Sequence, residues 1–140
     1  MDRHAHHKAL LAPLRAALYD FSESGVRAAL AEVCADDAVF RLAHPLGEVH
    51  GTDAFFQNAF APLVSAWPDL ERRDHIVMAG TDDHGHDWVG CGGYYLGVAL
   101  GPWLDIPPTG HIVHMRFHEF FRFVDGKVVE MQSLWDIPEV

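Results

Sequence analysis

A single glutamate interrupts an aromatic run near the C-terminus, in the segment HMRFHEFFRFVDGKVVEMQSLWD. Glu119 stands in a series in which every second residue is apolar: Met115, Phe117, Phe121 and Phe123. Alternate residues of a strand share one face, so Glu119 is predicted to point into the apolar side. Burial among apolar groups favours the protonated form of a carboxyl group unless a nearby cation offsets the effect. Two interpretations are open: a protonated acid that donates a hydrogen bond to a substrate oxygen, and a structural glutamate bonded to a buried partner.

A histidine before a turn is the second candidate for proton transfer. His44 precedes Pro45-Leu46-Gly47 at the end of an expected strand, and a neutral imidazole accepts protons near neutral pH. We predict that His44 removes a proton next to a carbonyl group while Glu119 donates a hydrogen bond to the developing enolate. The alternative is a histidine that ends a strand or is partly exposed, since the chain contains eleven.

Metal and nucleotide sites are not expected from the other motifs. HIVHMRFH contains three histidines, but on a strand His114 and His118 share a side that His111 does not. Cys34 and Cys91 form no metal motif or disulfide framework. GCGG is predicted to lie within a strand with no helix after it, unlike a dinucleotide-binding fingerprint. We therefore expect no metal and no cofactor.

Composition and charge exclude several classes of partner. The 140 residues are 49% hydrophobic and 21% charged, and the net charge is −10 with only ten Lys and Arg. Nucleic acid and anionic membranes are poor partners for such a chain. No apolar run approaches the roughly 20 residues of a membrane span, and the N-terminus lacks the apolar stretch of a signal peptide. We expect one cytoplasmic domain covering residues 1–140.

The elements that must hold these residues change character along the chain. Apolar residues at helical spacing predict three helices, near 5–20, 24–34 and 53–66. A strand, DDAVFRLAHP, falls between the last two helices. Four strand-like runs then follow: LERRDHIVMAG, HDWVGCGGYYLGVAL, HIVHMRFHEFFRFV and KVVEMQSLWDI. This order predicts an α+β domain in which a curved, mostly antiparallel sheet from residue 38 onward wraps around a helical layer.

The last hairpin determines which residues face Glu119. A three-residue loop, Val124-Asp125-Gly126, pairs Phe123 with Lys127 and Glu119 with Met131. This register keeps the apolar residues of both strands on one face. A two-residue loop would mix the faces, so we predict the longer loop.

Three segments carry a resemblance to a known family: CADDAVFRLAHPLGEVHG, the IPPTG turn and FRFVDGKVVEMQSLW. Their order and spacing resemble the NTF2-like superfamily over essentially the whole chain, and most closely its SnoaL-like polyketide cyclases. The resemblance implies a cone-shaped, curved antiparallel sheet closed by three N-terminal helices over an apolar pocket. We expect the pocket to be lined by Phe40, Phe60, Trp88, Tyr95, Trp103, Met115, Phe117, Phe121, Met131, Ser133 and Trp135.

The resemblance also bears on the candidate site. Ketosteroid isomerases, more distant relatives, place an aspartate base at the position of His44 and a protonated aspartate at that of Glu119. In SnoaL-type cyclases the catalytic aspartate falls on Ser133 and the histidine on Glu119. The cyclase acid–base set is therefore absent, although the sequence pattern of the fold is present.

Two classes of function remain open. One is a cyclase- or isomerase-like enzyme that performs proton transfer on a small hydrophobic carbonyl compound. The other is a non-catalytic module that binds a hydrophobic small molecule or dimerises. An open pocket containing His44 and Glu119 would favour the enzyme, and an aromatic-sealed pocket without His44 would favour the module. We also expect a homodimer formed through the outer face of the sheet, where aromatic and cationic residues mix.

Overall fold

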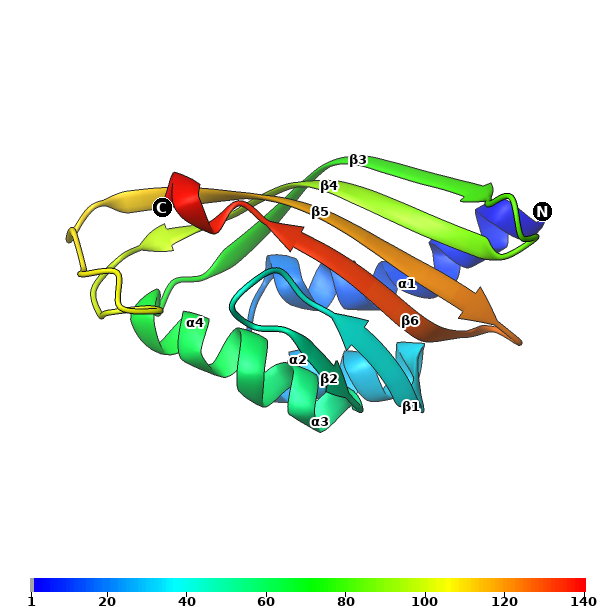
Figure 1. Ribbon diagram of the computed structural model, residues 1–140, viewed down its shortest axis with the longest axis horizontal. Helices are drawn as coiled ribbons and strands as arrows, with labels where there is room; N and C mark the ends of the chain where they lie inside the picture. The colour runs from blue at the N-terminus through cyan, green and yellow to red at the C-terminus, as the bar shows by residue number, and fades with distance from the viewer. Residues whose placement is uncertain (1) are drawn as a thin grey trace.

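A computed structural model describes residues 2–140, whose strands form one curved sheet above a layer of helices (Figure 1). The chain begins with two helices and two strands: α1 (Arg3–Tyr19), α2 (Glu23–Val33), β1 (Cys34–Arg41) and β2 (Glu48–His50). A third helical segment follows, interrupted by a π-helical turn: α3 (Thr52–Phe55), η1 (Phe56–Phe60) and α4 (Ala61–Ala66). The remaining elements are four long strands and a short 3₁₀ helix: β3 (Glu71–Thr81), β4 (Asp87–Val98), β5 (Ile112–Val124), β6 (Lys127–Trp135) and η2 (Ile137–Glu139). The predicted α+β architecture with three helical segments is confirmed.

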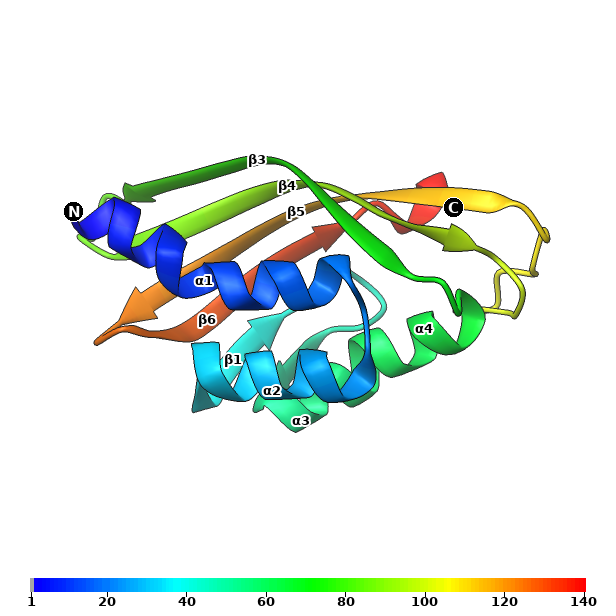
Figure 2. The same ribbon diagram turned by 180° about the vertical axis from the view of Figure 1, so that it is seen from behind.

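The sheet has six strands in the order β2-β1-β6-β5-β4-β3. Neighbouring strands are antiparallel except for β1 and β6, which are parallel. The sheet is curved and open, and the helices all lie on its concave side (Figure 2). Burial alternates along β5, with odd-numbered residues from Met115 to Phe123 buried and most even-numbered ones exposed. This alternation separates an inner, apolar face from an outer one.

The first two helices, α1 and α2, begin at side-chain caps. The carboxylate of Asp2 accepts a hydrogen bond from the backbone N–H of Ala5 at the start of α1 (2.7 Å). The hydroxyl of Ser22 accepts the N–H of Gly25 at the start of α2 (3.1 Å). Such caps satisfy backbone donors that have no partner within the helix. No helix among residues 2–140 is long and apolar enough to cross a membrane.

The predicted register of the last hairpin is wrong by two residues at Glu119, although Glu119, Met131 and Trp135 are buried on the inner face as predicted. Val128, and not Val129 as predicted, is the buried valine of β6. The loop is the two-residue turn Asp125-Gly126, in which both residues have positive φ (51° and 78°), and Val124 pairs with Lys127. This conformation matches the tight turn that suits the twist of two antiparallel strands. A bulge in β6, between the pairs Arg122–Glu130 and Phe123–Val128, then restores the alternation. Glu119 consequently lies opposite Ser133 instead of Met131 and still faces inward.

His7 attaches the N-terminal turn of α1 to the sheet. Its ring is 8% exposed and stacks on Phe123, with centroids 4.8 Å apart. Its Nδ1 is buried without a hydrogen-bond partner among the described residues. Burial lowers the pKa of His7 from its usual 6.5, and the nearby Asp87 opposes this effect. The folded state therefore favours the neutral imidazole.

Replacing His7 with Phe keeps the stacked ring and removes the titrating group. The unfolded chain protonates His7 near pH 6.5, whereas the folded chain does so only at lower pH. The wild type therefore loses stability as the pH falls below that value. We expect urea unfolding to show a smaller loss of unfolding free energy between about pH 7.5 and 5.5 for His7→Phe than for the wild type. His84→Gln, at an exposed loop position, should lose as much as the wild type; equal losses in all three proteins would contradict the prediction.

Candidate active site

Glu119 lies at the centre of a buried hydrogen-bond network on the concave face of the sheet. Its side chain is fully buried, as the sequence pattern predicts. One carboxylate oxygen accepts from Arg72 Nη1, and the other accepts from the Tyr95 hydroxyl (3.0 Å) and from Trp135 Nε1 (2.8 Å). We call these four residues the interior network. Arg72, Tyr95 and Trp135 all donate to Glu119, so its contacts are those of a carboxylate that accepts hydrogen bonds. These contacts match the second interpretation of the sequence, a structural glutamate bonded to buried partners.

Four neighbouring strands supply the interior network. Arg72 comes from β3, Tyr95 from β4, Glu119 from β5 and Trp135 from β6. Arg72 and Tyr95 are directly opposed across the β3–β4 pair, so their side chains share the inner face. Trp135 faces Phe117, two residues before Glu119 on the same face of β5. Strand register therefore brings together residues that are up to 63 positions apart, the separation from Arg72 to Trp135.

The guanidinium of Arg72 is the only cation of the interior network and is fully buried. Besides its bonds to Glu119 and Tyr95 (2.7 Å), it donates through Nε to Asp74 (3.1 Å), which also accepts from Arg15 of α1 (2.9 Å). Burial opposes the charge of Arg72, but Glu119, Tyr95 and Asp74 raise its pKa well above its usual value. Two arginines and two carboxylates thus alternate from α1 into the interior, and their charges balance.

One nitrogen of Arg72 has no partner. Nη2 is buried and makes no hydrogen bond among the described residues. Glu119 also retains capacity, because a carboxylate has about four acceptor positions and three donors bind it. Arg72 therefore has a free donor and Glu119 a free acceptor position, and these two residues are hydrogen-bonded to each other. Unpaired buried donors are uncommon in folded proteins, and each calls for an explanation.

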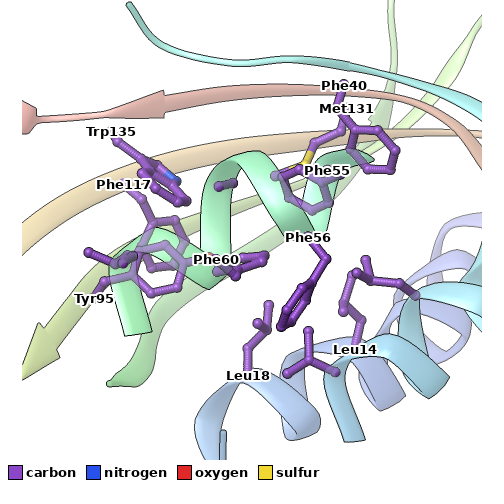
Figure 3. Close-up of a cluster of buried hydrophobic side chains, with 14 of the residues drawn as sticks. Leu14, Leu18, Phe40, Phe55, Phe56, Phe60, Tyr95, Phe117, Met131 and Trp135 are labelled. Carbon is purple, nitrogen blue, oxygen red and sulfur yellow. The ribbon is translucent and has the colours of Figure 1, made fainter. Parts of the chain in front are cut away.

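Aromatic rings pack around the network, and Figure 3 shows Phe60 and Phe117 near its members Tyr95 and Trp135. The ring of Phe117 lies 4.0 Å from the guanidinium carbon of Arg72, and Tyr95 packs against both Phe117 (4.9 Å) and Trp135 (5.2 Å). Phe60 contacts Tyr95 and Trp135 from the helical side, at 5.9 and 5.8 Å between centroids. Burial raises the pKa of the Tyr95 hydroxyl well above its usual value. These rings keep the charges away from water.

Most residues predicted to line a pocket fill the interior with their own side chains. Nine of them are buried: Phe40, Phe60, Tyr95, Trp103, Met115, Phe117, Phe121, Met131 and Trp135. Ser133 is half-buried opposite Glu119. Trp88 lies apart from these residues: it is opposite Gly80 and Arg122 on the outer face, where it lines a depression and donates from Nε1 to Asp82 (2.8 Å). Residues 88 and 95 are an odd number of positions apart on one strand, so they take opposite faces.

His44 does not join Glu119. It lies in the turn between β1 and β2, where its side chain is exposed, and this position matches the alternative of a solvent-exposed histidine at a strand end. The histidines His114 and His118 lie on the outer face of β5. Among residues 2–140, no group of three or more His, Cys, Asp and Glu is arranged to hold a metal ion.

Sequence reasoning missed Arg72, the partner that determines the electrostatics of Glu119. A weak signal was available, because Leu70, Arg72 and Asp74 alternate in LERRDHIVMAG and predict one inward face. The adjacent Arg73, which is exposed, conceals this pattern. A shift in register between Asp74 and Ile76 then ends the alternation. Only the pairing of β3 with β4 identifies Arg72 as the inward arginine.

Comparison with known proteins identifies the family. Residues 12–139 match the family model of SnoaL-like polyketide cyclases. The chain belongs to this family. A search of curated proteins found no match.

Solved structures share the fold of this SnoaL-like chain along nearly its whole length. A candidate SnoaL-like polyketide cyclase from Jannaschia sp. has 23% identity and a TM-score of 0.81, over 99% of this chain and 92% of that one. AclR, a candidate hydroxylase from Streptomyces galilaeus, has 25% identity and a TM-score of 0.75, over 97% and 78%. An NTF2-like protein of unknown function from Burkholderia pseudomallei has 15% identity and a TM-score of 0.70, over 96% and 93%. The NTF2-like fold expected from the sequence is confirmed.

The buried ion pair predicts how stability responds to substitution. Glu119→Leu leaves the Arg72 charge buried without its main counter-charge, so we expect it to lower the free energy of unfolding by about 3–5 kcal/mol. Replacing both partners, in Arg72→Met/Glu119→Leu, should recover most of that loss, because the charges are removed together. Urea unfolding of the two single variants and the double variant measures this coupling. Additive losses would show that Arg72 and Glu119 do not depend on each other.

Proposed function

We propose that this SnoaL-like protein is a cyclase- or isomerase-type enzyme that transfers a proton on a small hydrophobic carbonyl compound bound at the interior network. The observation that carries the proposal is the free Nη2 of Arg72 beside the incompletely occupied carboxylate of Glu119. Removal of a proton next to a carbonyl needs a base for the proton and a donor for the enolate oxygen. Glu119 would supply the base and Arg72 the donor.

The chemistry assigns a different role to Glu119 from the one inferred from sequence. As a carboxylate, Glu119 takes the proton from the carbon next to the carbonyl group, and the electron pair of the C–H bond forms the enolate. The enolate oxygen accepts hydrogen bonds from Arg72 Nη2. In a conjugated enolate, Glu119 then returns the proton to a different carbon, which is isomerisation; alternatively, the enolate carbon attacks a second carbonyl of the same molecule, whose oxygen takes the proton from Glu119, which is cyclisation. The Tyr95 hydroxyl, bonded to both Arg72 and Glu119, holds the two groups in place.

Membership of the family supports this role for the network. Exclusion of water strengthens electrostatic interactions with a developing enolate. A buried ion pair also contributes little net stability compared with well-packed apolar residues. Well-packed apolar residues in the places of both Arg72 and Glu119 would give comparable stability, so a functional use is a reason for the presence of the pair.

A second function is favoured by a separate observation. The interior is closed by Phe117, Phe121, Met131 and Trp135, all nearly inaccessible, and His44 is outside it. This arrangement fits a module that binds a hydrophobic small molecule without changing it. Proton exchange separates the two functions, because binding alone leaves the ligand's carbon-bound protons unchanged.

Deuterium uptake from D₂O by small aromatic ketones and 1,3-dicarbonyl compounds, followed by NMR, tests the enzymatic proposal. We expect the wild type to accelerate exchange at the carbon next to the carbonyl. Glu119→Gln, which is similar in shape and lacks the base, should slow it by about 10²–10⁴-fold. His44→Gln is the matched control, an amide substitution at an exposed position, and should exchange at the wild-type rate. Exchange at the wild-type rate in Glu119→Gln would eliminate Glu119 as the base, and a wild type that does not accelerate exchange would leave ligand binding as the function.

The outer face of the sheet supports the homodimer expected from the sequence. Four large apolar side chains on it are 44–62% exposed: Ile76, Met78, Phe120 and Leu134. Next to them Met78, Trp88 and Phe120 line a depression of about 550 Å³. An interface related by a two-fold axis needs projections and a recess on the same surface, and this face contains both.

Sedimentation at micromolar concentration checks the dimer. We expect a species of twice the 15.6 kDa chain mass. Leu134→Glu places a charge on the outer face and should give the monomer, because burying an unpaired charge in an interface is costly. Leu100→Glu makes the same change at an equally exposed loop position and should remain dimeric. A wild type that sediments only as a monomer would exclude this interface.

A further inference from the structure

The loop between β4 and β5 covers one end of the interior. It lies at the end of the sheet, beside the C-terminal end of α4 (Figures 1 and 2). From Leu100 to His114 only Trp103 is buried, with 3% of its surface exposed. Its ring packs against Trp67, just after α4 (centroids 5.7 Å apart), and against Trp135 of the interior network (6.2 Å). A single side chain therefore attaches this loop to the interior, and that side chain covers a member of the network.

The indole of Trp103 is buried without a hydrogen bond. Its Nε1 has no partner among residues 2–140. An unpaired buried donor costs free energy, which exposure to water would recover. A cavity of about 10 Å³, close to the smallest that holds a water molecule, also lies against the ring and is lined by Trp67, Pro107 and Thr109. Neither hydrogen bonding nor packing therefore fixes this ring completely in its buried position.

The backbone that carries Trp103 is strained. Trp103 and Ile106 exchange both backbone hydrogen bonds (3.1 and 2.8 Å), so Leu104-Asp105 is a two-residue turn. Both of its residues have positive φ, 49° and 64°. Asn-Gly is the preferred sequence for such a turn, whereas a leucine rarely adopts positive φ. Strain of this kind is concentrated at functional and switching segments.

The loop has few hydrogen bonds to the rest of the protein. From Pro102 to Pro108 the two bonds between Trp103 and Ile106 are the only ones among the described residues. The base of the loop is fixed, because the backbone N–H of Gly101 donates to the carbonyl of Ala66 (3.0 Å). Segments with few hydrogen bonds and few buried contacts open at a low cost in free energy. Residues 102–108 can therefore move as a unit about a fixed base.

We infer that residues 102–108 form a gate: Trp103 leaves the interior, and the space that its ring vacates beside Trp135 gives access to the interior network. The inference rests on the proposed function, because the closed interior must open before a substrate can reach Glu119. It adds the route of entry, at the end of the sheet next to α4, and makes Trp103 the residue that controls it. Opening can be measured on the protein alone, without a ligand.

Hydrogen exchange at the indole N–H of Trp135, followed by NMR, measures the opening. This N–H is buried and donates to Glu119 (2.8 Å), so it exchanges only when water reaches it. Backbone amides of β4, which lies between β3 and β5, report global unfolding. The indole of Trp88 on the outer face is an internal control, because the gate does not cover it. We expect Trp135 to be less protected from exchange than the amides of β4, each compared with its rate in the unfolded chain.

Substitutions in two matched turns test the role of the strain. Leu104→Asn/Asp105→Gly gives the gate its preferred turn sequence, so the closed loop becomes more stable and exchange at Trp135 should slow by about tenfold. Asp125→Asn creates the same Asn-Gly sequence in the turn Asp125-Gly126, which also has two positive φ angles and lies at the opposite end of β5. This control should leave exchange at Trp135 unchanged relative to the amides of β4. Asp105→Gly alone takes the place of the double variant if the latter does not fold.

Removing the indole should have the opposite effect to relieving the strain. Trp103→Ala loses the ring that attaches the loop, so exchange at Trp135 should accelerate by about tenfold or more relative to the amides of β4. The indole of Trp88 should keep its wild-type rate. Exchange at Trp135 that follows the amides of β4 in every variant would overturn the inference, because the interior would then open only when the whole domain unfolds.

The gate and the proposed function fail separately. Opening at Trp135 without deuterium uptake by the ketones removes the catalysis and keeps the gate. Deuterium uptake by the ketones in the wild type, together with exchange at Trp135 only through global unfolding, removes the gate and keeps the catalysis.

Discussion

The ion pair between Arg72 and Glu119, from which water is excluded on both sides, is the constraint on which the interior of this protein depends. Neither charge is tolerable alone in an apolar environment, because desolvation of an unpaired ion costs more than any single packing contact returns. The two side chains come from β3 and β5, with β4 between them. Bringing them together requires that three strands pair in one register, and Tyr95 and Trp135 complete the hydrogen bonds of the carboxylate. The position of Glu119 is therefore coupled to the arrangement of most of the sheet.

The sheet keeps two kinds of surface apart. Its concave face carries the interior network and the aromatic rings that cover it, and the helical layer closes this side (Figures 1 and 2). Its outer face carries Trp88 and Phe120 around an open depression. Because side chains alternate along each strand, a residue belongs to one surface or the other. The proposed chemistry and the proposed dimer interface thus lie on opposite sides of the same strands, and a substitution on one side need not disturb the other.

Membership of the SnoaL-like family establishes the fold and leaves the chemistry of this chain to its own residues. The positions at which such cyclases place their acid and base hold Ser133 and Glu119 here, and Ser133 lies directly opposite Glu119. What replaces the missing set is an arginine on β3 with one unused nitrogen. A cationic donor and a carboxylate base are a chemically sufficient pair for forming an enolate. The proposed proton transfer would therefore use a different combination of groups on the same fold.

The local sequence pattern by itself determined the positions of the helical segments and the inward orientation of Glu119. Helical spacing located all three helical segments, and period-two alternation placed Glu119 inside, because both signals arise from the geometry of a few neighbouring residues. The same alternation places Trp88 and Tyr95 on opposite faces of β4. Only the tertiary structure decided the partner of Glu119, since Arg72 is 47 residues away and its neighbour Arg73 has the same charge. The hairpin register likewise depended on a bulge within β6 that compensates for the short turn. These features are set by pairing between distant strands, and the energy that selects the pairing comes from burying the whole inner face at once.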